Sequence, residues 1–517
     1  MKKFNILLLA LMLLTVFTIT GCDWQQVLEE LDKNPQKVID KTEKERGPLE
    51  EESQMKDWAI MIYGSLDIEP QLEKALLQEL LEITKLGNLD GKIHLLAQID
   101  FRNAKYIPSK RYYIRKNELV VRGKMNNMNM GDPRTFEDFL NWSMQYPAKK
   151  RMLYILGHGT GWISVEGPGS IVENLRQNTR SSVNDAYDRL YPSSLYQTKE
   201  KMTRRGGRSF AYDHGSKDCL TLKEAGRVLD RVLHGDKIDI LAFRSCLMNQ
   251  LETAYEFSKH FNYMVASQTS QFGVAEGIMT TVMGVNNIGF DPTVLEYIKR
   301  SGSNISPRDL AREMFVSIKN TNKKIIDNVQ DMAFSAQCLD LRALNRAVQP
   351  FKELSQLLKA NLRNYDTRDF TLKLLTSSRD QAVKFGGLFE GIYTEDSGDS
   401  EYEYVDLGTF MRNMSFYDGM DSYKHGLLLS NIRDLSQAVR ANLDRACIDK
   451  FSSALAFNGE RSGGVTSIFM FPAKEKLTKI YFKLMEDKYR ALDFNRETGW
   501  NTVLNEYYKD SIPTAEY

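Results

Sequence analysis

Two short apolar runs near the middle of the chain carry the clearest pattern of hydrophobic positions. Met152–Leu156 and Ile238–Phe243 are each followed at once by small or polar residues, which predicts two buried strands that end there. His158 follows the first run and Cys246 follows the second. The carboxyl ends of strands in an open α/β sheet line the crevice where ligands bind, so we expect both side chains at that edge.

Short apolar runs alternate with amphipathic segments from about residue 58 to residue 287. The expected helices are Leu72–Leu86, Thr135–Gln145, Leu222–Leu233 and Leu247–His260. This alternation predicts an α/β fold with a mostly parallel sheet flanked by helices, which we assign to a domain at 57–290.

The second half of the chain is richer in helical patterns and forms an expected C-terminal subdomain at 291–517. Its predicted helices are Pro307–Lys319, Leu344–Lys359 and Met420–Asn442, followed by a strand at Val465–Pro472 and an amphipathic terminal helix. Within the first domain the pattern fails at 164–216, which is polar and rich in Arg, Asn and Ser. A loop of this length is usually functional or disordered, and composition alone makes a solvated insertion about as likely as a functional segment.

The chemistry of His158 and Cys246 suggests a cysteine hydrolase. A thiol is a good nucleophile only as the thiolate, and a nearby imidazole both lowers the thiol pKa and carries the proton. Glycines around His158 let backbone N–H groups approach a ligand closely. We expect Cys246 at the start of the helix Leu247–His260, where free N–H groups would stabilise a thiolate. Taken singly, such a Cys is more often a small core residue and such a His is more often structural.

Two longer motifs and a series of shorter ones occur along the chain in a fixed order. The two central ones are His-Gly-Thr-Gly-Trp at 158–162 and Phe-Arg-Ser-Cys-Leu-Met at 243–248 with Glu252. The others are Trp58–Tyr63 with Asp67, Ala97–Asp100, Gly131–Pro133, Tyr146–Ala148, Asp218–Thr221, Val265–Ser267, Phe334–Ala336, Tyr404–Leu407 and Thr466–Pro472. Each motif is weak alone, but together they cover about residues 57 to 508, and their order resembles the clostripain family of cysteine peptidases, in the caspase-like clan.

The resemblance implies a caspase-like fold and a peptidase acting on proteins or peptides. Cys246 would be the nucleophile and His158 the acid and base, with backbone N–H groups of Gly159 and Cys246 holding the oxyanion. The family's interval at 164–216 holds an activation cleavage, for which Arg204 and Arg205 are the dibasic candidates. The resemblance implies no certain cofactor, although some members need calcium, so calcium is possible.

Two positions depart from the family pattern in the pocket for the residue before the scissile bond. The family carries acids there, whereas this chain has Arg244 and Gln268. A guanidinium in place of a carboxylate reverses the sign of the pocket, so we expect specificity altered away from Arg and Lys. An internal ion pair of Arg244 would instead leave a neutral or occluded pocket.

The first residues resemble a lipoprotein signal peptide, expected at 1–21. Lys2 and Lys3 precede an apolar stretch, and Ile19–Cys22 resembles a bacterial lipobox in which Cys22 is lipidated. The charged segment 22–56 would be a tether, which predicts a lipid-anchored protein of the bacterial cell envelope, periplasm-facing or on the cell surface. An ordinary cleaved signal or an uncleaved helix is the alternative. A formal net charge of +1 suggests no nucleic-acid partner.

The remaining cysteines indicate scattered thiols rather than a disulfide framework. Cys219, Cys246, Cys338 and Cys447 are widely spaced, and no CxxC or HExxH motif suggests a metal site. Two other functions stay open beside the peptidase. One is a non-catalytic surface lipoprotein that keeps the fold as a binding module, and the other is an amidase on non-peptide amides.

Overall fold

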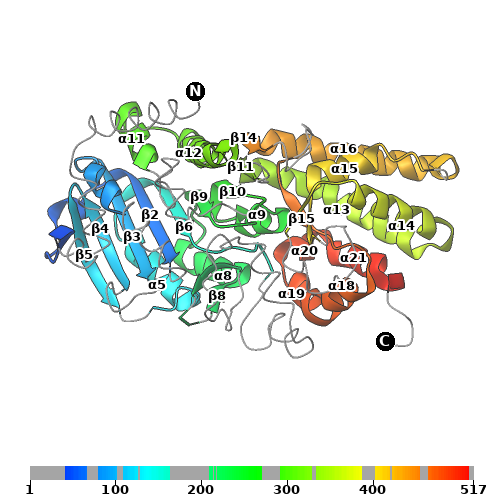
Figure 1. Cartoon of the computed structure of the whole chain (residues 1–517), viewed down its shortest axis with the longest axis horizontal. Coiled ribbons are helices and arrows are strands. Elements are labelled where there is room, and N and C mark those ends of the chain that lie inside the picture. Colours follow the sequence, from blue (N-terminus) through cyan, green and yellow to red (C-terminus); the bar gives the residue numbers. More distant parts are fainter. Residues whose placement is uncertain are drawn as a thin grey trace, which may run out of the picture.

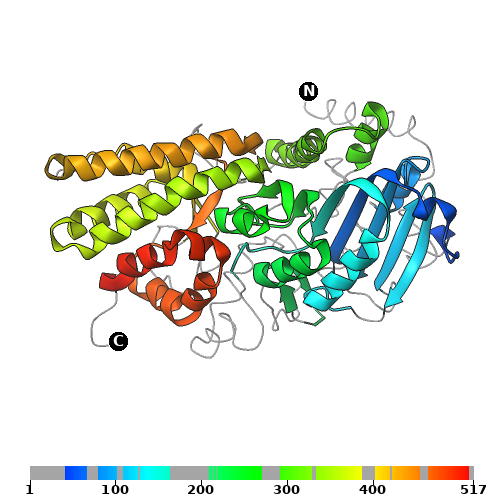
Figure 2. The same cartoon turned by 180° about the vertical axis from the view of Figure 1, so that it is seen from behind.

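The computed structural model describes most of the chain after residue 40. The described ranges are 41–66, 80–101, 109–125, 128–163, 209–213, 215–216, 218–269, 292–328, 334–386, 402–419, 422–453 and 464–511. Within these ranges the molecule is elongated, with a large twisted sheet at one end and a set of long helices at the other (Figure 1). The reverse view in Figure 2 shows the same two ends, with the last helices of the chain lying beneath the long ones.

A ten-stranded mixed sheet forms the centre of the fold. Its order is β1-β5-β4-β3-β2-β6-β9-β10-β11-β14. The strands are β1 (Glu43–Lys44), β2 (Lys56–Leu66), β3 (Ile93–Phe101), β4 (Ser109–Arg115), β5 (Glu118–Met125), β6 (Ala148–Leu156), β9 (Ile238–Arg244), β10 (Phe261–Ser267), β11 (Ser335–Asp340) and β14 (Cys447–Ser452). The five strands from β3 to β10 run parallel, and antiparallel pairs flank them on both sides.

Helices cover both faces of the parallel centre, because alternate side chains of its strands point to opposite faces. Ile60 and Ile62 of β2 belong to the core under α11 (Pro292–Ser301) and α12 (Pro307–Asn328). Met61 and Tyr63 belong to the other core, which contains α5, α8 and α9. Those three helices span Pro133–Met144, Leu222–Leu233 and Leu251–Ser258. The expected α/β fold is confirmed, with a sheet that is parallel in its middle and in the short edge pair of β1 and β5.

The C-terminal half both extends the sheet and builds the helical end. It supplies β11 and β14, a small sheet of β12 (Lys384–Phe385), β13 (Tyr404–Asp406) and β15 (Ser467–Phe469), and a series of helices. The helices are α13 (Leu341–Arg363), α14 (Tyr365–Asp380), α15 (Leu407–Ser415), α16 (Gly426–Ala446), α18 (Glu475–Ile480), α19 (Glu486–Arg490), α20 (Asp493–Thr498) and α21 (Trp500–Tyr508). Short helical turns lie at Glu50–Ser53, Ser422–His425, Tyr481–Met485 and Lys509–Ser511.

Two expectations about connecting segments were wrong in part. Residues 210–213, expected within the long loop 164–216, form β7 (Phe210–Asp213), which pairs with β8 (Asp218–Leu220). The segment expected as a tether is folded from residue 41 onward, because β1 pairs with β5 and Lys110 holds Glu43 at 2.6 Å. The remainder of both segments lies outside the described residues.

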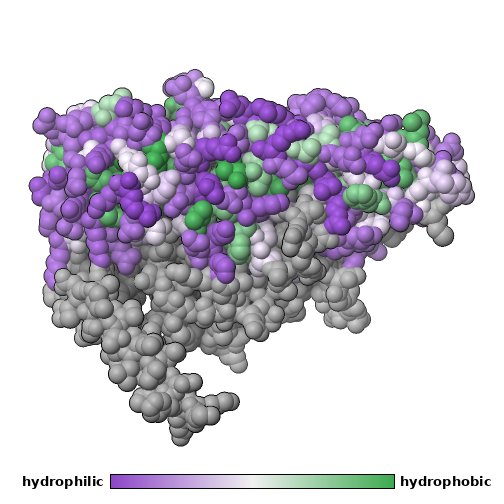
Figure 3. Space-filling model, turned by 90° about the horizontal axis from the view of Figure 1, so that it is seen from above, coloured by the Kyte–Doolittle hydropathy of each residue, from purple (hydrophilic) through white to green (hydrophobic). Residues whose placement is uncertain are grey.

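The surface seen from the side of α12 and α16 is mostly hydrophilic, with small separate apolar patches (Figure 3). Within the described ranges, no helix has both the length and the hydropathy needed to cross a bilayer.

Candidate active site

The two predicted site residues follow neighbouring strands at the centre of the sheet. β6 and β9 pair in parallel up to Leu156 and Arg244, and the N–H of Gly157 donates to the carbonyl of Arg244 at 3.4 Å. The segment 157–163, called here the His loop, carries His158, and the segment 245–250, called here the Cys loop, carries Cys246. The sheet register therefore places both residues two positions beyond paired strand ends.

The two loops touch at Gly159. A Cβ built at this glycine would lie 2.6 Å from the carbonyl oxygen of Cys246 and 2.8 Å from the Cβ of Ser245. These distances are too short for any side chain, so glycine is what lets the His loop lie against the backbone of the Cys loop. The chain neighbour of His158 is thus in direct contact with the main chain of Cys246.

The helix after Cys246 begins later than expected. α9 starts at Leu251, four residues beyond the predicted start at Leu247, and ends at Ser258 rather than at His260. Leu247 instead has φ of +57°, a left-handed conformation that is uncommon for a leucine. The turn at Leu247 separates Cys246 from the helix, so the thiol does not sit at the first turn of α9.

Main-chain hydrogen bonds hold the Cys loop in this conformation. The N–H of Leu247 donates to the carbonyl of Thr269 at 3.1 Å, and the N–H of Asn249 donates to that of Ser267 at 2.9 Å. On the other side, the N–H of Ser467 in β15 donates to the carbonyl of Asn249 at 3.1 Å. Beyond the turn at Leu247 the loop therefore passes between the end of β10 and β15, and these tertiary bonds replace the first turn of the predicted helix.

The amide of Asn249 also ties the Cys loop to the second half of the chain. Its Nδ2 donates to the carbonyl of Val465 at 2.9 Å and to the Oε1 of Gln337. The side chain of Gln250 points the other way, to the His loop, with its Oε1 accepting from the N–H of Trp162 at 3.1 Å. Neither side chain was among the predicted site residues. The available signal was a pair of amides inside a segment that is otherwise apolar.

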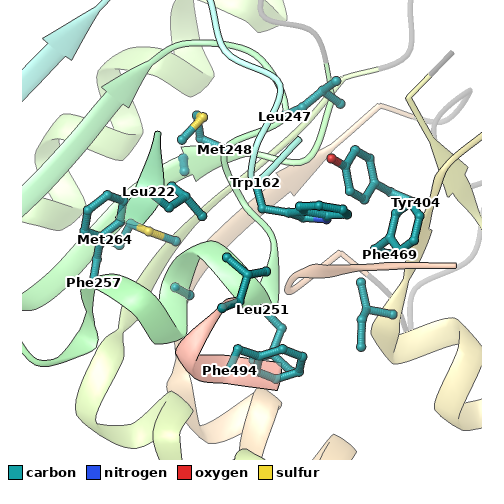
Figure 4. Packing of buried hydrophobic residues seen from close by; sticks show 14 of the residues in the cluster. Trp162, Leu222, Leu247, Met248, Leu251, Phe257, Met264, Tyr404, Phe469 and Phe494 are labelled. Carbon is teal, nitrogen blue, oxygen red and sulfur yellow. The ribbon is translucent and has the colours of Figure 1, made fainter. Parts of the chain in front are cut away.

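Trp162 packs the His loop against the C-terminal half of the chain. Its ring packs edge-on against Phe469 and Tyr489, with centroids 5.0 and 4.8 Å apart. Figure 4 shows it between Leu251 on one side and the rings of Tyr404 and Phe469 on the other. The hydroxyl of Tyr404 donates to the carbonyl of Thr160 at 2.8 Å. Residues from the first and second halves of the chain thus build one site.

The two predicted pocket residues lie in different surroundings. Arg244 is the last residue of β9 and is 8% exposed. Gln268 is 1% exposed, and its Nε2 donates to the Oδ2 of Asp406 at 2.9 Å and to the Oγ of Ser467 at 3.0 Å. Its Oε1 accepts from Ser335 and from Gln337. All these contacts are made within the protein, so the amide of Gln268 joins β10, β11, β13 and β15.

Two buried carboxyl groups lie close to the Cys loop. Burial raises the pKa of Glu252 to about 7, although its Oε1 accepts from the N–H of Phe469 at 2.9 Å and from the hydroxyl of Tyr489 at 2.8 Å. Burial also raises the pKa of Asp406, against the hydrogen bonds from Gln268, Thr409 and Gly464. Both groups therefore bind protons at higher pH than in the unfolded chain.

The described cysteines form no disulfide, as the sequence predicts. Cys219, Cys246 and Cys338 are buried and Cys447 is half-buried. Burial raises the pKa of the Cys338 thiol well above its usual range and that of Cys447 to about 11. Those two thiols are therefore weak nucleophiles at neutral pH.

Three predicted residues, Cys22, Arg204 and Arg205, lie outside the described residues. In the described part of the chain, no group of three or more His, Cys, Asp or Glu residues is placed to hold a metal ion. The possibility of calcium stays a prediction.

The fold and the loops define a class of protein, an α/β fold with Cys and His after neighbouring parallel strands of the central sheet. A profile of the clostripain family matches residues 194–507, which is more than half of the chain. The protein belongs to the clostripain family.

The chain is also similar to one curated relative and to solved structures. The chain is similar to clostripain of Hathewaya histolytica, with 23% identity over 232 residues, 39% of this chain and 36% of that protein. The match thus spans about a third of the relative's length. A secreted C11 cysteine protease of Bacteroides thetaiotaomicron, "iotapain", shares 12% identity at a TM-score of 0.51 and covers 86% of this chain and 99% of its own. An inactive zymogen of a C11 protease from Parabacteroides distasonis shares 14% identity at a TM-score of 0.48, with coverage of 86% and 99%. The likeness to iotapain supports the caspase-like fold.

Proposed function

We propose that the protein is an active cysteine endopeptidase that uses Cys246 and His158 as a catalytic dyad. The observation that carries this proposal is the contact between the two loops, in which Gly159 lies against the carbonyl of Cys246 at the ends of adjacent parallel strands. Cys246 attacks the scissile carbonyl through its sulfur, and His158 gives a proton to the leaving amine. His158 then takes a proton from the water that hydrolyses the acyl-enzyme.

The backbone around the dyad supports an oxyanion site. The N–H groups of Gly159 and Cys246 belong to two loops held together at that glycine, so they are fixed before substrate binds. Such donors are already oriented where charge develops, which lowers the barrier without reorganisation.

We further propose that Arg244 turns primary specificity away from Arg and Lys. Its buried position directly before the Cys loop supports a place at the floor of the pocket. A substrate with Asp or Glu before the scissile bond would pair with the guanidinium, whereas a basic residue would meet a like charge. Gln268 is the second pocket residue in this proposal, acting through the hydrogen bonds that hold the strand after the Cys loop.

The cellular part of the proposal is a lipid anchor at Cys22 in the bacterial cell envelope. The lipobox-like run Ile19–Cys22 supports it. Membrane partitioning of wild type and Cys22→Ala, with a lipid label on the same samples, tests it. Equal partitioning together with an unlabelled wild type would contradict the anchor.

A peptide-library digestion of wild type, Cys246→Ala, His158→Ala and Cys219→Ala tests the catalytic part. Removing a nucleophile costs up to about a millionfold in kcat, so the first two variants should be inactive. Cys219→Ala is the matched control, because Cys219 and Cys246 are buried to a similar extent, 5% and 6% exposed. Hydrolysis that survives Cys246→Ala would contradict the dyad.

Alkylation separates a peptidase from a non-catalytic binding module that keeps the fold. Iodoacetamide should label Cys246 faster than Cys338 or Cys447, and His158→Ala should remove that difference. The same library then reports specificity. Efficient cleavage after Arg or Lys by wild type would contradict the role of Arg244.

A further inference from the structure

Gln250 makes an unusual set of contacts for a residue next to a helix start. Its side-chain amide is buried, 1% exposed, and lies between the two loops that carry the proposed dyad. Its Oε1 accepts from the N–H of Trp162 at 3.1 Å. Its Nε2 donates to the carbonyl of Leu247 at 2.8 Å and reaches the carbonyl of Thr160 at 3.5 Å. One amide thus joins the residue after Cys246 to two residues of the His loop.

The backbone of the His loop is shaped around this amide. Gly161 has φ of +73°, and a Cβ built on it would lie 1.7 Å from the Nε2 of Gln250. Glycine is therefore required here for two reasons: it adopts the left-handed turn without strain, and its lack of a Cβ leaves room for the amide of Gln250. Ser209 adds a further tie on the far side of the same turn, with its Oγ donating to the carbonyl of Gly161 at 2.7 Å.

We propose that Gln250 is a positioning residue that sets the His loop and the Cys loop in register for catalysis. This inference rests on the proposed peptidase function. Gln250 has no role in bond making here, and it acts through the main chain on either side of the dyad. Errors of about 1 Å in such a register cost on the order of a hundredfold in rate, because reacting groups must meet at close range.

The need for both a donor and an acceptor provides the test. Gln250→Glu keeps the shape and the acceptor. When protonated, its O–H can donate to the carbonyl of Leu247 while its C=O accepts from Trp162. When ionised, it has no donor and places a charge against carbonyl oxygens, and burial with these neighbours raises its pKa. Activity of this variant relative to wild type should therefore be high at low pH and fall as pH rises between about 5 and 8.

Three variants should be compared with wild type in kcat and KM across this pH range. Gln250→Met fills the same space without hydrogen bonds and should lose about a hundredfold in kcat at every pH, with KM changed by less than about threefold. The kcat of Gln250→Glu relative to wild type should fall as pH rises. Ser209→Ala is the matched control, since the Oγ of Ser209 also donates to the His loop, at the carbonyl of Gly161, and no hydrogen bond described for Ser209 reaches the Cys loop. It should lose less than about tenfold in kcat, and its kcat relative to wild type should stay constant across pH.

The outcomes separate this inference from the proposed function. Active wild type with inactive Cys246→Ala supports the proposed function. In that case the positioning role is overturned if the activity of Gln250→Glu relative to wild type does not change with pH. It is also overturned if folded Gln250→Met has near-normal kcat. If wild type cleaves no peptide, the proposed function fails, and the rate of Cys246 alkylation across pH takes the place of kcat. A Gln250→Glu to wild-type alkylation ratio that falls with pH supports the role of Gln250, and a flat ratio overturns it.

Discussion

Two buried polar regions of this protein are held together by different chemistry. At the N-terminal edge of the sheet, charged pairs join residues 43–52 to β4 and β5, through Glu43 with Lys110 and through Glu52 with Arg122. Around the Cys loop the contacts are made largely by the amides of Asn249, Gln250 and Gln268. The edge is held by ion pairs, whereas the amides that hold the site are neutral.

This difference has a consequence for catalysis. Amides keep their hydrogen bonds across pH and salt, and they add no net charge beside a dyad whose protonation decides its activity. Ion pairs weaken with salt and with protonation. We therefore expect the amide contacts of the site to be less sensitive to salt than the ion pairs of the N-terminal edge.

The largest expected effect comes from Gly159→Ala, which breaks the contact between the loops. The added Cβ would lie 2.6 Å from the carbonyl of Cys246, and backbone cannot move aside as a side chain can. We expect a loss of more than about a thousandfold in kcat/KM, from misplacement of the dyad together with the oxyanion donor.

Gly226→Ala is the control for that variant. Gly226 lies in α8, where a Cβ meets nothing within 4 Å, so alanine should raise stability by about 0.5–1 kcal/mol and leave activity unchanged. Peptide hydrolysis and thermal unfolding of both variants check this. Gly159→Ala with near-normal activity would mean that the loops are not in register through Gly159.

The second effect concerns Gln268→Glu, which places a charge in the amide network. The new carboxylate would face Asp406, whose Oδ2 now accepts from the Nε2 of Gln268 at 2.9 Å. Two buried carboxylates in contact cannot both ionise, so we expect a loss on the order of 3 kcal/mol in the free energy of unfolding at neutral pH. The loss should shrink as pH falls, because a protonated Glu can donate in place of the amide.

Denaturant unfolding at several pH values measures this effect, with Gln381→Glu, at the exposed residue that follows α14, as the control. A stable Gln268→Glu at neutral pH would contradict the described network. Because Gln268→Glu is expected to destabilise the fold, the charge of the pocket is better tested with Arg244→Asp alone than with both substitutions together.

The sequence predicted most of the parallel centre of the fold. β6 and β9 were found because strands buried on both faces are continuous apolar runs. The bounds of α8 were predicted correctly, since Thr221 and Glu224 form a capping box that marks its start. Such signals lie within the residues of the element that they predict.

The parts that sequence reasoning missed depend on distant partners. Leu247, Leu251 and Ala254 have helical spacing, yet Leu247 adopts a left-handed turn because β10 and β15 take up the backbone bonds around it. The role of Gln250 has the same origin, since its partners in the His loop, Trp162 and Thr160, lie 88 and 90 residues earlier. His158 and Cys246 were accessible from sequence because they follow strand ends and fall in motifs of a known family.

The third effect concerns Glu252, a buried acid that lies close to the amides around the Cys loop. Glu252→Gln removes a carboxyl group whose pKa burial raises to about 7. A raised pKa in the folded state gives stability that is present below the unfolded value and is lost as pH rises through the folded one. Wild type should therefore lose about 3 kcal/mol relative to Glu252→Gln between about pH 4.5 and pH 7. The unfolding temperature of wild type should fall relative to that of Glu252→Gln as pH rises through this range, and a constant difference would show that Glu252 is not buried as a titrating acid.

The smallest expected effect tests the charged edge itself. Lys110→Met removes the partner of Glu43, which lies 2.6 Å from the Lys110 Nζ with both side chains largely buried. Tyr112 still donates to Glu43 at 2.8 Å, so we expect a loss of only about 1–2 kcal/mol. Lys124→Met is the control, because its pair with Glu45 is exposed and should contribute close to nothing. Salt should lower the stability of wild type more than that of Lys110→Met, while kcat/KM stays within about twofold in both. A change in activity with salt or with Lys110→Met would show that the edge and the site are coupled, and the contrast between the two regions would then fail.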